Sequence, residues 1–436
     1  MTNHKEHQTT NSPWFGNIPP NWKTKRFKYL TKPKKEFSKN GEEELLSVTE
    51  VRGIIKRREI RSDDENLSRS DDLTGYKHVK KGDLVSNIML VWKRGLGVSS
   101  YNGIVSPAYS VFTFSDECHP EFYNYLVRSD EYITEFRKHS TGITMSRLRL
   151  YDDSFGAVFA HVPPIKEQKL ITSFLDKKTD QIDRLINKIQ KKIKTLQEQR
   201  ITLVSKCVTK GLDPNVEMKE SGIEWIGKIP KNWVVTKLKY LCPKGVQYGL
   251  NIESESYTDV GIRFLRITDI NSDGTLKRND GVFLPVENVP KEYLIKKNDI
   301  LFSRSGGTVG KSTRINSIQN PMSFAGYLVR FSFENEEISK FVKWVSESVF
   351  YWSWIDIQII QSTIQNVNGE KYSNFSFPIP PISEISIINK FLLKKTLKID
   401  EIVNKYKDKI DLLLNYRQSL ISSVVTGKVP ITEDMI

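Results

Sequence analysis

The stretch PPIKEQKLITSFLDKKTDQIDRLINKIQKKIKTLQEQRITLVSKCVT, residues 163–209, decides the architecture, because the chain contains it twice. The second copy, residues 380–426, reads PPISEISIINKFLLKKTLKIDEIVNKYKDKIDLLLNYRQSLISSVVT and matches the first at 22 of 47 positions. Apolar residues recur in both copies at spacings of three and four, and no Gly or Pro follows the opening prolines. Each copy therefore predicts one helix of about 40 residues, roughly 60 Å long.

The segments that precede the two helices are also related. Residues 14–22 (WFGNIPPNW) match residues 225–233 (WIGKIPKNW), and Lys28–Leu30 matches Lys239–Leu241, giving 9 identities in a window of 17 positions. A shorter echo links residues 80–84 (KKGDL) to residues 296–300 (KKNDI). The chain therefore has the order of a variable segment, a helix, a second variable segment and a second helix.

The two variable segments combine strand and helix patterns. We expect strands at Asp83–Leu90, Tyr109–Phe114, Gly261–Ile267, Asp299–Arg304 and Ala325–Phe333, and helices at Pro120–Lys138 and Ile338–Ile360. The fold class is thus α+β, with two mixed domains joined by two long helices. A long apolar stripe must be covered, and the other copy of the helix is the natural cover. We predict an antiparallel intramolecular coiled coil with pseudo-twofold symmetry; the alternative is two separate helices, each packed on its own domain.

These elements imply seven segments. The predicted bounds are 1–13 for a polar tail, 14–162 for the first domain, 163–210 for the central helix, 211–225 for a linker, 226–379 for the second domain, 380–427 for the C-terminal helix and 428–436 for a tail.

The composition favours a polyanionic partner. Lys and Arg number 66 against 52 Asp and Glu, a net charge of +14, which suggests nucleic acid first and a membrane surface second; the alternative is an ordinary basic surface. The cysteines Cys118, Cys207 and Cys242 lie far apart, which fits a reducing compartment rather than a disulfide framework. The polar N-terminus does not resemble a signal peptide, and Val349–Ile360 is too short to span a bilayer. We expect a cytoplasmic location.

Several loops pair basic residues with glycine or with one another, which suits contacts to phosphates and base edges. The candidate DNA-binding residues are Lys93, Arg94, Arg147, Arg149, Lys277, Arg278, Arg304 and Lys311. For each one alone, the alternative is an ordinary basic loop that faces solvent.

No motif predicts catalysis. Residues 305–312 (SGGTVGKS) resemble a phosphate-binding loop, but Ser305 replaces the first glycine, and Pro321 leaves no room for the helix that should follow. Asp213, Glu217 and Lys219 imitate a nuclease cluster, yet Pro214 places them in a linker, where we expect no supporting strand. The six histidines lack metal-ligand spacing. We expect no catalytic residue, metal or cofactor in this chain.

The whole pattern resembles the specificity subunit of type I restriction–modification systems. The resemblance rests on Ile229–Trp233, on the two Pro-Pro-Ile-x-Glu openings at 163–167 and 380–384, and on Gly211–Asn215 ahead of Gly222–Gly227. One departure is Ile385, which stands where the first copy has Gln168, and it puts one local contact in doubt.

The resemblance implies a non-catalytic reader of double-stranded DNA. The two domains would be target-recognition domains, each reading one half of a bipartite site. The helices would set the spacer and dock methyltransferase subunits, two in number, and restriction and translocase subunits would join through the complex. S-adenosylmethionine, ATP and Mg would then belong to the partner subunits. The alternatives are a standalone DNA methyltransferase or nuclease, and a coiled-coil DNA-binding adaptor or repressor.

Overall fold

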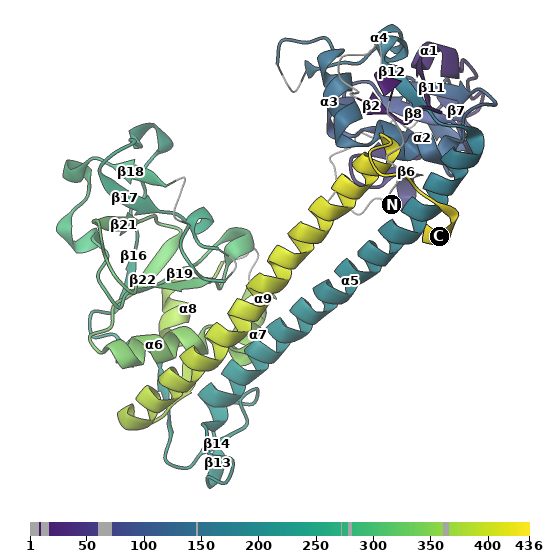
Figure 1. Cartoon of the computed structure of the whole chain (residues 1–436). Helices are drawn as coiled ribbons and strands as arrows, with labels where there is room; N and C mark the ends of the chain where they lie inside the picture. The colour runs from purple at the N-terminus through teal and green to yellow at the C-terminus, as the bar shows by residue number, and fades with distance from the viewer. Residues whose placement is uncertain are drawn as a thin grey trace. The chain divides into compact units, whose positions relative to one another are not determined.

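The computed structural model describes residues 8–9, 17–59, 72–144, 147–271, 273–277, 281–360 and 366–436 (Figure 1). The chain packs into two units. Unit 1 comprises Met1–Ile189 and Lys407–Ile436, and unit 2 comprises Gln190–Tyr406. Each long helix is therefore shared, because its first and second halves belong to different units.

Unit 1 is built around an antiparallel sheet with the strand order β4-β11-β8-β9. Its strands are β1 (Gln8–Thr9), β2 (Asn17–Ile18), β3 (Lys23–Arg26), β4 (Thr31–Pro33), β5 (Leu46–Thr49), β6 (Gly53–Lys56), β7 (Lys77–Val79), β8 (Leu84–Asn87), β9 (Leu96–Val98), β10 (Gly103–Val105), β11 (Tyr109–Phe114) and β12 (Phe159–Val162). Its shorter helices are α1 (Phe27–Leu30), η1 (Arg57–Glu59), η2 (Val91–Lys93), α2 (Pro120–Val127), α3 (Asp130–Lys138) and α4 (Asp152–Ala157). Phe27 lies at the centre of an aromatic core, with its ring centre 4.6 Å from that of Phe155.

Unit 2 repeats this plan with the sheet order β16-β22-β19-β20. Its strands are β13 (Met218–Glu220), β14 (Lys228–Pro230), β15 (Val234–Lys237), β16 (Val246–Tyr248), β17 (Ile262–Leu265), β18 (Val282–Leu284), β19 (Ile300–Ser303), β20 (Ser312–Arg314), β21 (Met322–Phe324), β22 (Leu328–Phe331) and β23 (Ser376–Ile379). Its shorter helices include η4 (Leu238–Leu241), η9 (Gly306–Thr308), α6 (Glu336–Val345), α7 (Val349–Ile360) and α8 (Gly369–Asn374). The pair β3·β12 in unit 1 corresponds to β15·β23 in unit 2, so the duplication extends through the folds.

The two long helices, α5 (Ile165–Lys210) and α9 (Ile382–Val425), contain 46 and 44 residues. In unit 2, Arg200 Nε of α5 lies 3.0 Å from the Asp400 carboxylate of α9, and Lys192 Nζ lies 5.9 Å from the centre of the Tyr406 ring. The α5 numbers rise between these contacts while the α9 numbers fall, so the helices are antiparallel. The predicted α+β class and the antiparallel pairing of long helices are thereby confirmed.

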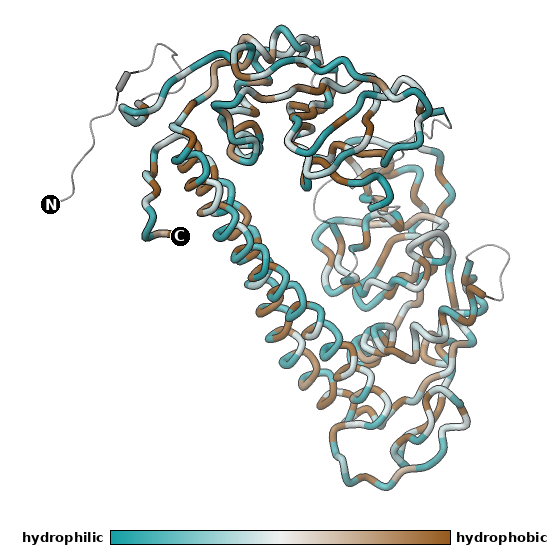
Figure 2. Tube along the Cα trace, turned by 90° about the vertical axis from the view of Figure 1, so that its right-hand side faces the viewer, coloured by the Kyte–Doolittle hydropathy of each residue, from teal (hydrophilic) through white to brown (hydrophobic). Residues whose placement is uncertain are grey.

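Unit 1 repeats this ion pair with its partners exchanged between the helices. Arg417 Nε of α9 lies 3.2 Å from the Asp183 carboxylate of α5, and these two residues are the copies of Arg200 and Asp400 at an offset of 217 positions. Hydrophobic and hydrophilic positions alternate along both helices (Figure 2), as a stripe of core residues within a solvated helix requires. The repeat is therefore preserved in side-chain contacts as well as in sequence.

A recurring cluster, which we name the Trp–Glu latch, explains the duplicated motifs. In unit 1, the buried Trp22 donates its indole N–H to Glu167 at 2.9 Å. In unit 2, the buried Trp233 donates to Glu384 at 3.0 Å. The neighbouring asparagines, Asn21 and Asn232, donate to the same carboxylates. Residues 14–16 of the first motif lie outside the described residues.

A glycine that follows the helix of the other copy closes each latch. Gly427, after α9, adopts a φ of 75° beside Trp22, and Gly211, after α5, adopts a φ of 71° beside Trp233. A positive φ is available to Gly at little cost, which explains why this residue ends both helices. Each latch thus joins the start of one repeat to the end of the other.

The short repeat at residues 80–84 and 296–300 forms the same turn in both units, and the side chain of its aspartate closes the turn. Asp83 accepts from the backbone N–H of Lys80 at 2.7 Å, and Asp299 accepts from that of Lys296 at 2.7 Å. A buried Lys34 ammonium lies 2.8 Å from the Asp83 carboxylate. The shared Asp is thus explained by the geometry of the turn.

Two predicted helices are each divided in two, so the expectation of continuous helices at 120–138 and 338–360 was wrong. Ser129 separates α2 from α3, and its hydroxyl donates to the Leu126 carbonyl at 2.8 Å. Ser348 lies between α6 and α7 and donates to the Val345 carbonyl at 2.6 Å. The same kind of contact occurs inside the unbroken α5, where Ser205 donates to the Ile201 carbonyl at 2.8 Å, so these serines mark the two breaks but do not by themselves cause them.

Each of the five predicted ranges contains one observed strand, and the other strands of both units were not predicted. β11 covers all of Tyr109–Phe114, whereas β8, β17, β19 and β22 are shorter than predicted. The expectation that no strand lies in the linker was wrong, because Met218–Glu220 forms β13, which pairs with β14.

The two long helices differ at the residue that follows the shared glutamate. In α5, Gln168 accepts a hydrogen bond from the His119 N–H at 2.7 Å, whereas in α9 the equivalent Ile385 is buried in an apolar core.

Candidate nucleic-acid interface

In unit 1, the first basic loop follows β8. Lys93 ends η2, and its ammonium lies 3.5 Å from Glu50 and 5.0 Å from the centre of the Trp92 ring. Arg94 adopts a φ of 61°, donates from Nε to the Arg128 carbonyl at 3.3 Å and pairs with Asp130. Lys93 is exposed at this loop, whereas much of the Arg94 guanidinium is engaged by protein groups.

Arg128 fixes the shape of this loop, although no sequence motif predicts this role. Its guanidinium donates to the carbonyls of Arg94 and Leu96 at 2.9 and 2.6 Å, and to those of Glu50 and Val51 at 2.8 and 3.0 Å. Burial lowers the pKa of Arg128 to about 10, which still leaves it charged at neutral pH. A guanidinium that satisfies four carbonyls holds two loops in one arrangement.

Arg147 and Arg149 line a cavity of about 550 Å³ in unit 1. Both side chains are exposed, and the backbones of Arg149 and Thr141 pair through two hydrogen bonds of 2.9 Å. Met89, from the loop after β8, and Tyr151, which precedes α4, also line this cavity. The structure therefore brings the predicted arginine pair together with an exposed thioether and an exposed phenol, a set suited to base edges and phosphates.

In unit 2, the corresponding loop follows β19 and begins at Arg304. The Arg304 guanidinium carbon lies 5.2 Å from the centre of the Tyr248 ring, a cation–π contact. The Tyr248 hydroxyl accepts from the Gly369 N–H at 2.9 Å, which fixes the ring. Arg304 Nε is buried, and no group in the described part of the chain accepts a hydrogen bond from it.

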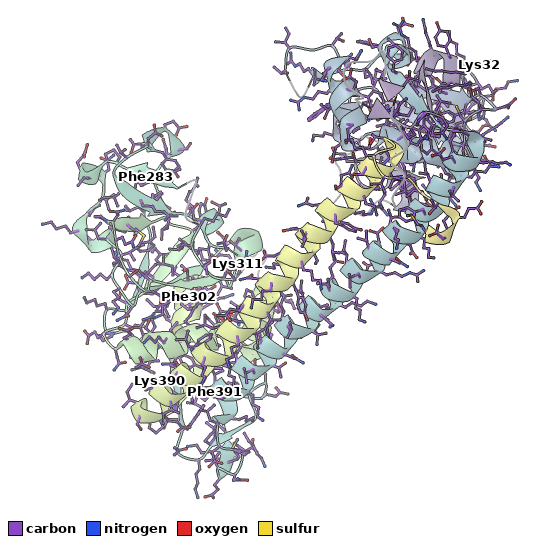
Figure 3. The ribbon with its side chains drawn as sticks, viewed as in Figure 1. Lys32, Phe283, Phe302, Lys311, Lys390 and Phe391 are labelled. Carbon is purple, nitrogen blue, oxygen red and sulfur yellow. The ribbon has the colours of Figure 1, made fainter. Side chains whose placement is uncertain are left out.

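The tip of this loop projects away from the fold. A side chain added at Gly306 or Gly307 would meet nothing within 4 Å. Lys311, labelled in Figure 3, ends the loop, and its carbonyl accepts from the Ser303 N–H at 2.8 Å. The exposed Tyr327 lies alongside, because its carbonyl accepts from the Arg304 N–H at 3.0 Å. Arg304 and Lys311 thus mark the two ends of one projecting loop.

The remaining predicted pair is only half described. Lys277 is exposed, and its backbone N–H donates to the Asp269 carbonyl at 2.9 Å. Arg278 lies outside the described residues. The assignment of all eight basic residues to DNA contact stays a prediction.

Of the two motifs that resembled enzymes, the first lacks the helix that should follow it, whereas the second does include a strand, because Lys219 lies on β13. η9 is a short turn followed by the strand β20, so no helix follows residues 305–312 to bind a phosphate. In the nuclease-like cluster, Glu217 pairs with Lys231 at 2.7 Å. Across the described ranges, no group of three or more His, Cys, Asp or Glu side chains is placed to hold a metal ion. Nor does any described helix have the length and apolar character needed to cross a bilayer.

The sequence was compared with protein-family models and with known proteins. No protein-family model matches the chain. It is 22% identical over 311 residues to the type I restriction enzyme MjaVIII specificity subunit of Methanocaldococcus jannaschii, a match that covers 70% of this chain and 69% of that protein. It is 25% identical over 207 residues to the type I restriction enzyme EcoKI specificity subunit of Escherichia coli, covering 46% of this chain and 44% of that subunit.

The fold is also shared with a solved structure. A solved structure from a study of complex assembly and conformational transition of the type I R-M system matches with a TM-score of 0.70 at 15% identity, covering 94% of this chain and 99% of that one. The resemblance drawn from the duplicated motifs is thereby confirmed: this chain is a relative of the specificity subunits of type I restriction enzymes.

Proposed function

We propose that this chain is the DNA sequence-recognition subunit of a type I restriction–modification complex. The observation that carries the proposal is the duplication itself. Two units share a sheet plan, a latch and an ion pair, yet their equivalent loops differ: Lys93 and Arg94 follow β8 in unit 1, and the projecting loop from Arg304 to Lys311 follows β19 in unit 2. A common frame with different basic loops suits two readers of different half-sites.

The shared helices would set the number of unread base pairs between the half-sites. We further propose that they dock two methyltransferase subunits and that restriction and translocase subunits join through the complex. S-adenosylmethionine, ATP and Mg would be bound by those partners, and this chain would contribute recognition without catalysis.

We also propose a cytoplasmic location. Cys118, Cys207 and Cys242 are buried free thiols. Burial raises the pKa of Cys207 to about 11, which keeps it protonated and unreactive at neutral pH. Unpaired thiols of this kind fit a reducing compartment.

The test is reconstitution with the methyltransferase subunits of the same host, followed by genome-wide mapping of methylated adenines. We expect methylation at one bipartite, asymmetric site, and only when this chain is present. Arg304→Ala should relax the preference at one half-site and leave the other unchanged. Methylation or cleavage by the isolated chain would instead indicate a standalone enzyme, and failure of methyltransferase subunits to co-purify with the chain from its native host would indicate an adaptor or repressor.

A further inference from the structure

Each unit displays the same exposed pair of residues at the start of its fold. In unit 1, Lys28 and Tyr29 lie on α1, with the ammonium 5.1 Å from the centre of the ring. In unit 2, Lys239 and Tyr240 lie on η4, with the ammonium 5.4 Å from the centre of the ring. Tyr29 is 65% exposed and Tyr240 is 69% exposed, so most of each ring faces solvent. We name these pairs the Lys–Tyr turns.

The fold fixes both turns in the same way. The residue before each pair is buried, Phe27 in unit 1 and Leu238 in unit 2. The Phe27 N–H donates to the Val158 carbonyl at 2.9 Å, and the Leu238 N–H donates to the Phe375 carbonyl at 3.0 Å. Packing therefore accounts for the buried residue and for the backbone path, but it does not require an exposed lysine and tyrosine in both copies.

A six-residue helix connects each turn to candidate DNA-binding residues of its own unit, which we call the reading residues: Arg147 and Arg149 in unit 1, and Arg304 in unit 2. In unit 1, α4 begins after Tyr151, which lines the arginine cavity, and its Gly156 packs against Lys28. Six residues of helix rise about 9 Å. The Lys–Tyr turn therefore lies within about one helix length of the cavity.

Unit 2 has the same arrangement. The Gly369 N–H at the start of α8 donates to Tyr248, the ring on which Arg304 lies, and Asn374 at the end of α8 accepts from Lys239 Nζ at 3.0 Å. The reading residues differ between the units, whereas the turn beside them is the same.

The surroundings of both turns are basic. Neither Lys28 nor Lys239 forms an ion pair with a carboxylate of the described residues, and both are exposed. Further exposed cations on the same segments are Lys23, Arg26, Lys32 (labelled in Figure 3) and Lys35 in unit 1, and Lys237 and Lys244 in unit 2. Exposed acidic residues also lie nearby, Glu36, Asp152 and Asp153 in unit 1 and Glu370 in unit 2, but the exposed cations outnumber them in both units, so the net charge near each turn is positive.

We propose that the two Lys–Tyr turns bind the phosphate backbone of the DNA next to each half-site. The inference rests on the proposed function. Two half-sites of different sequence share only their sugar–phosphate backbone, so residues that stay the same in both units match the part of the ligand that stays the same. Lysine ammonium groups and tyrosine hydroxyls are common partners of phosphate oxygens, and such contacts set register without reading sequence.

The test compares charge-neutralising variants in the complete complex of this chain with its methyltransferase subunits. For Lys28→Ala combined with Lys239→Ala, the plot of log affinity against log salt concentration should become shallower by about 1.8, which is ~0.9 for each lost phosphate contact. Affinity for a scrambled duplex should fall by the same factor as affinity for the recognised one, and the methylated sequence should not change. Lys219→Ala, an exposed lysine on β13, is the matched control and should leave the slope unchanged.

Two results would overturn the proposal. One is an unchanged salt slope in the double variant, with folding verified by circular dichroism. The other is loss of methyltransferase subunits on co-purification at an unchanged slope, which would make the turns a protein-docking surface. If the unaltered complex shows no sequence preference in methylation, the proposed function itself fails, and that outcome is read from the unaltered protein alone.

Discussion

Three glycines with nearly equal backbone conformations allow the latch to be tested quantitatively. Gly222, Gly211 and Gly427 have φ values of 75°, 71° and 75°. Placing Ala in this left-handed region costs roughly 1–2 kcal/mol. A side chain at Gly222 would meet nothing within 4 Å, so Gly222→Ala measures this backbone cost alone.

The other two positions add contacts of different severity. At Gly427, a Cβ would lie 2.4 and 2.8 Å from two ring atoms of Pro19 and 3.2 Å from Trp22. A proline ring has little freedom to move, so we add about 1–3 kcal/mol for overpacking. At Gly211, the nearest atoms are a Glu384 oxygen at 3.1 Å and Trp233 at 3.3 Å, which need to yield only slightly. The expected order of destabilisation is Gly427→Ala, then Gly211→Ala, then Gly222→Ala.

Hydrogen exchange measured by mass spectrometry suits this test, because a chain of two units need not unfold in one step. Gly427→Ala should speed exchange at the end of α9 and around Trp22, and it should leave the Trp233 region unchanged. Gly211→Ala should do the reverse with a smaller effect. If Gly427→Ala behaves like Gly222→Ala, the packing of the α9 terminus on Pro19 and Trp22 is refuted.

Three further results are expected. Glu384→Leu should destabilise unit 2 by about 1–3 kcal/mol in urea unfolding, because it leaves the Trp233 N–H buried without an acceptor, and Glu384→Gln should cost less; equal costs would contradict the hydrogen bond. Burial lowers the pKa of His161 to about 3 in the folded protein, whereas an unfolded histidine has a pKa of ~6.5. Between these values His161 is neutral in the folded protein and protonated in the unfolded chain, so acid favours unfolding. Stability should therefore fall by about 2 kcal/mol between pH 7 and pH 5, and a His161→Gln variant that loses as much stability as the unaltered chain would argue against this. Gly82→Asn should be tolerated better than Gly82→Val in thermal unfolding, since Asn298 adopts a φ of 72° at the same place in unit 2; equal melting temperatures would count against the shared turn.

The duplicated segments made much of the architecture predictable. Apolar periodicity between residues 165 and 209 indicates a helix without tertiary information, and its recurrence at 382–426 indicates an equivalent cover for its apolar stripe. The breaks at Ser129 and Ser348 were not predicted, because the apolar pattern continues across both, and a serine bonds a nearby carbonyl inside an unbroken helix as well. Periodicity reports which face of a segment is buried and does not report where the helix is interrupted.

The candidate site was predicted less completely. Both halves of the latch were visible as motifs, yet Trp22 and Glu167 are 145 positions apart, and no local pattern signals that they meet. The same holds for Tyr248 under Arg304 and for the carbonyls that Arg128 binds. Basic loops are visible in a sequence, but the long-range partners that orient each guanidinium follow only from the fold.

The division of the long helices has a consequence for synthesis on the ribosome. Unit 2 is one continuous stretch, Gln190–Tyr406, whereas unit 1 needs Lys407–Ile436 in addition to its early portion. Lys407 follows Ile189 by 407 − 189 = 218 positions, a wait of about 10–40 s at ~5–20 residues per second. During that interval the apolar surfaces of Trp22 and Ile171 await Val424 and Val425. The portion that is translated first is therefore the last to complete its fold. Until then it exposes an apolar surface to which a chaperone could bind.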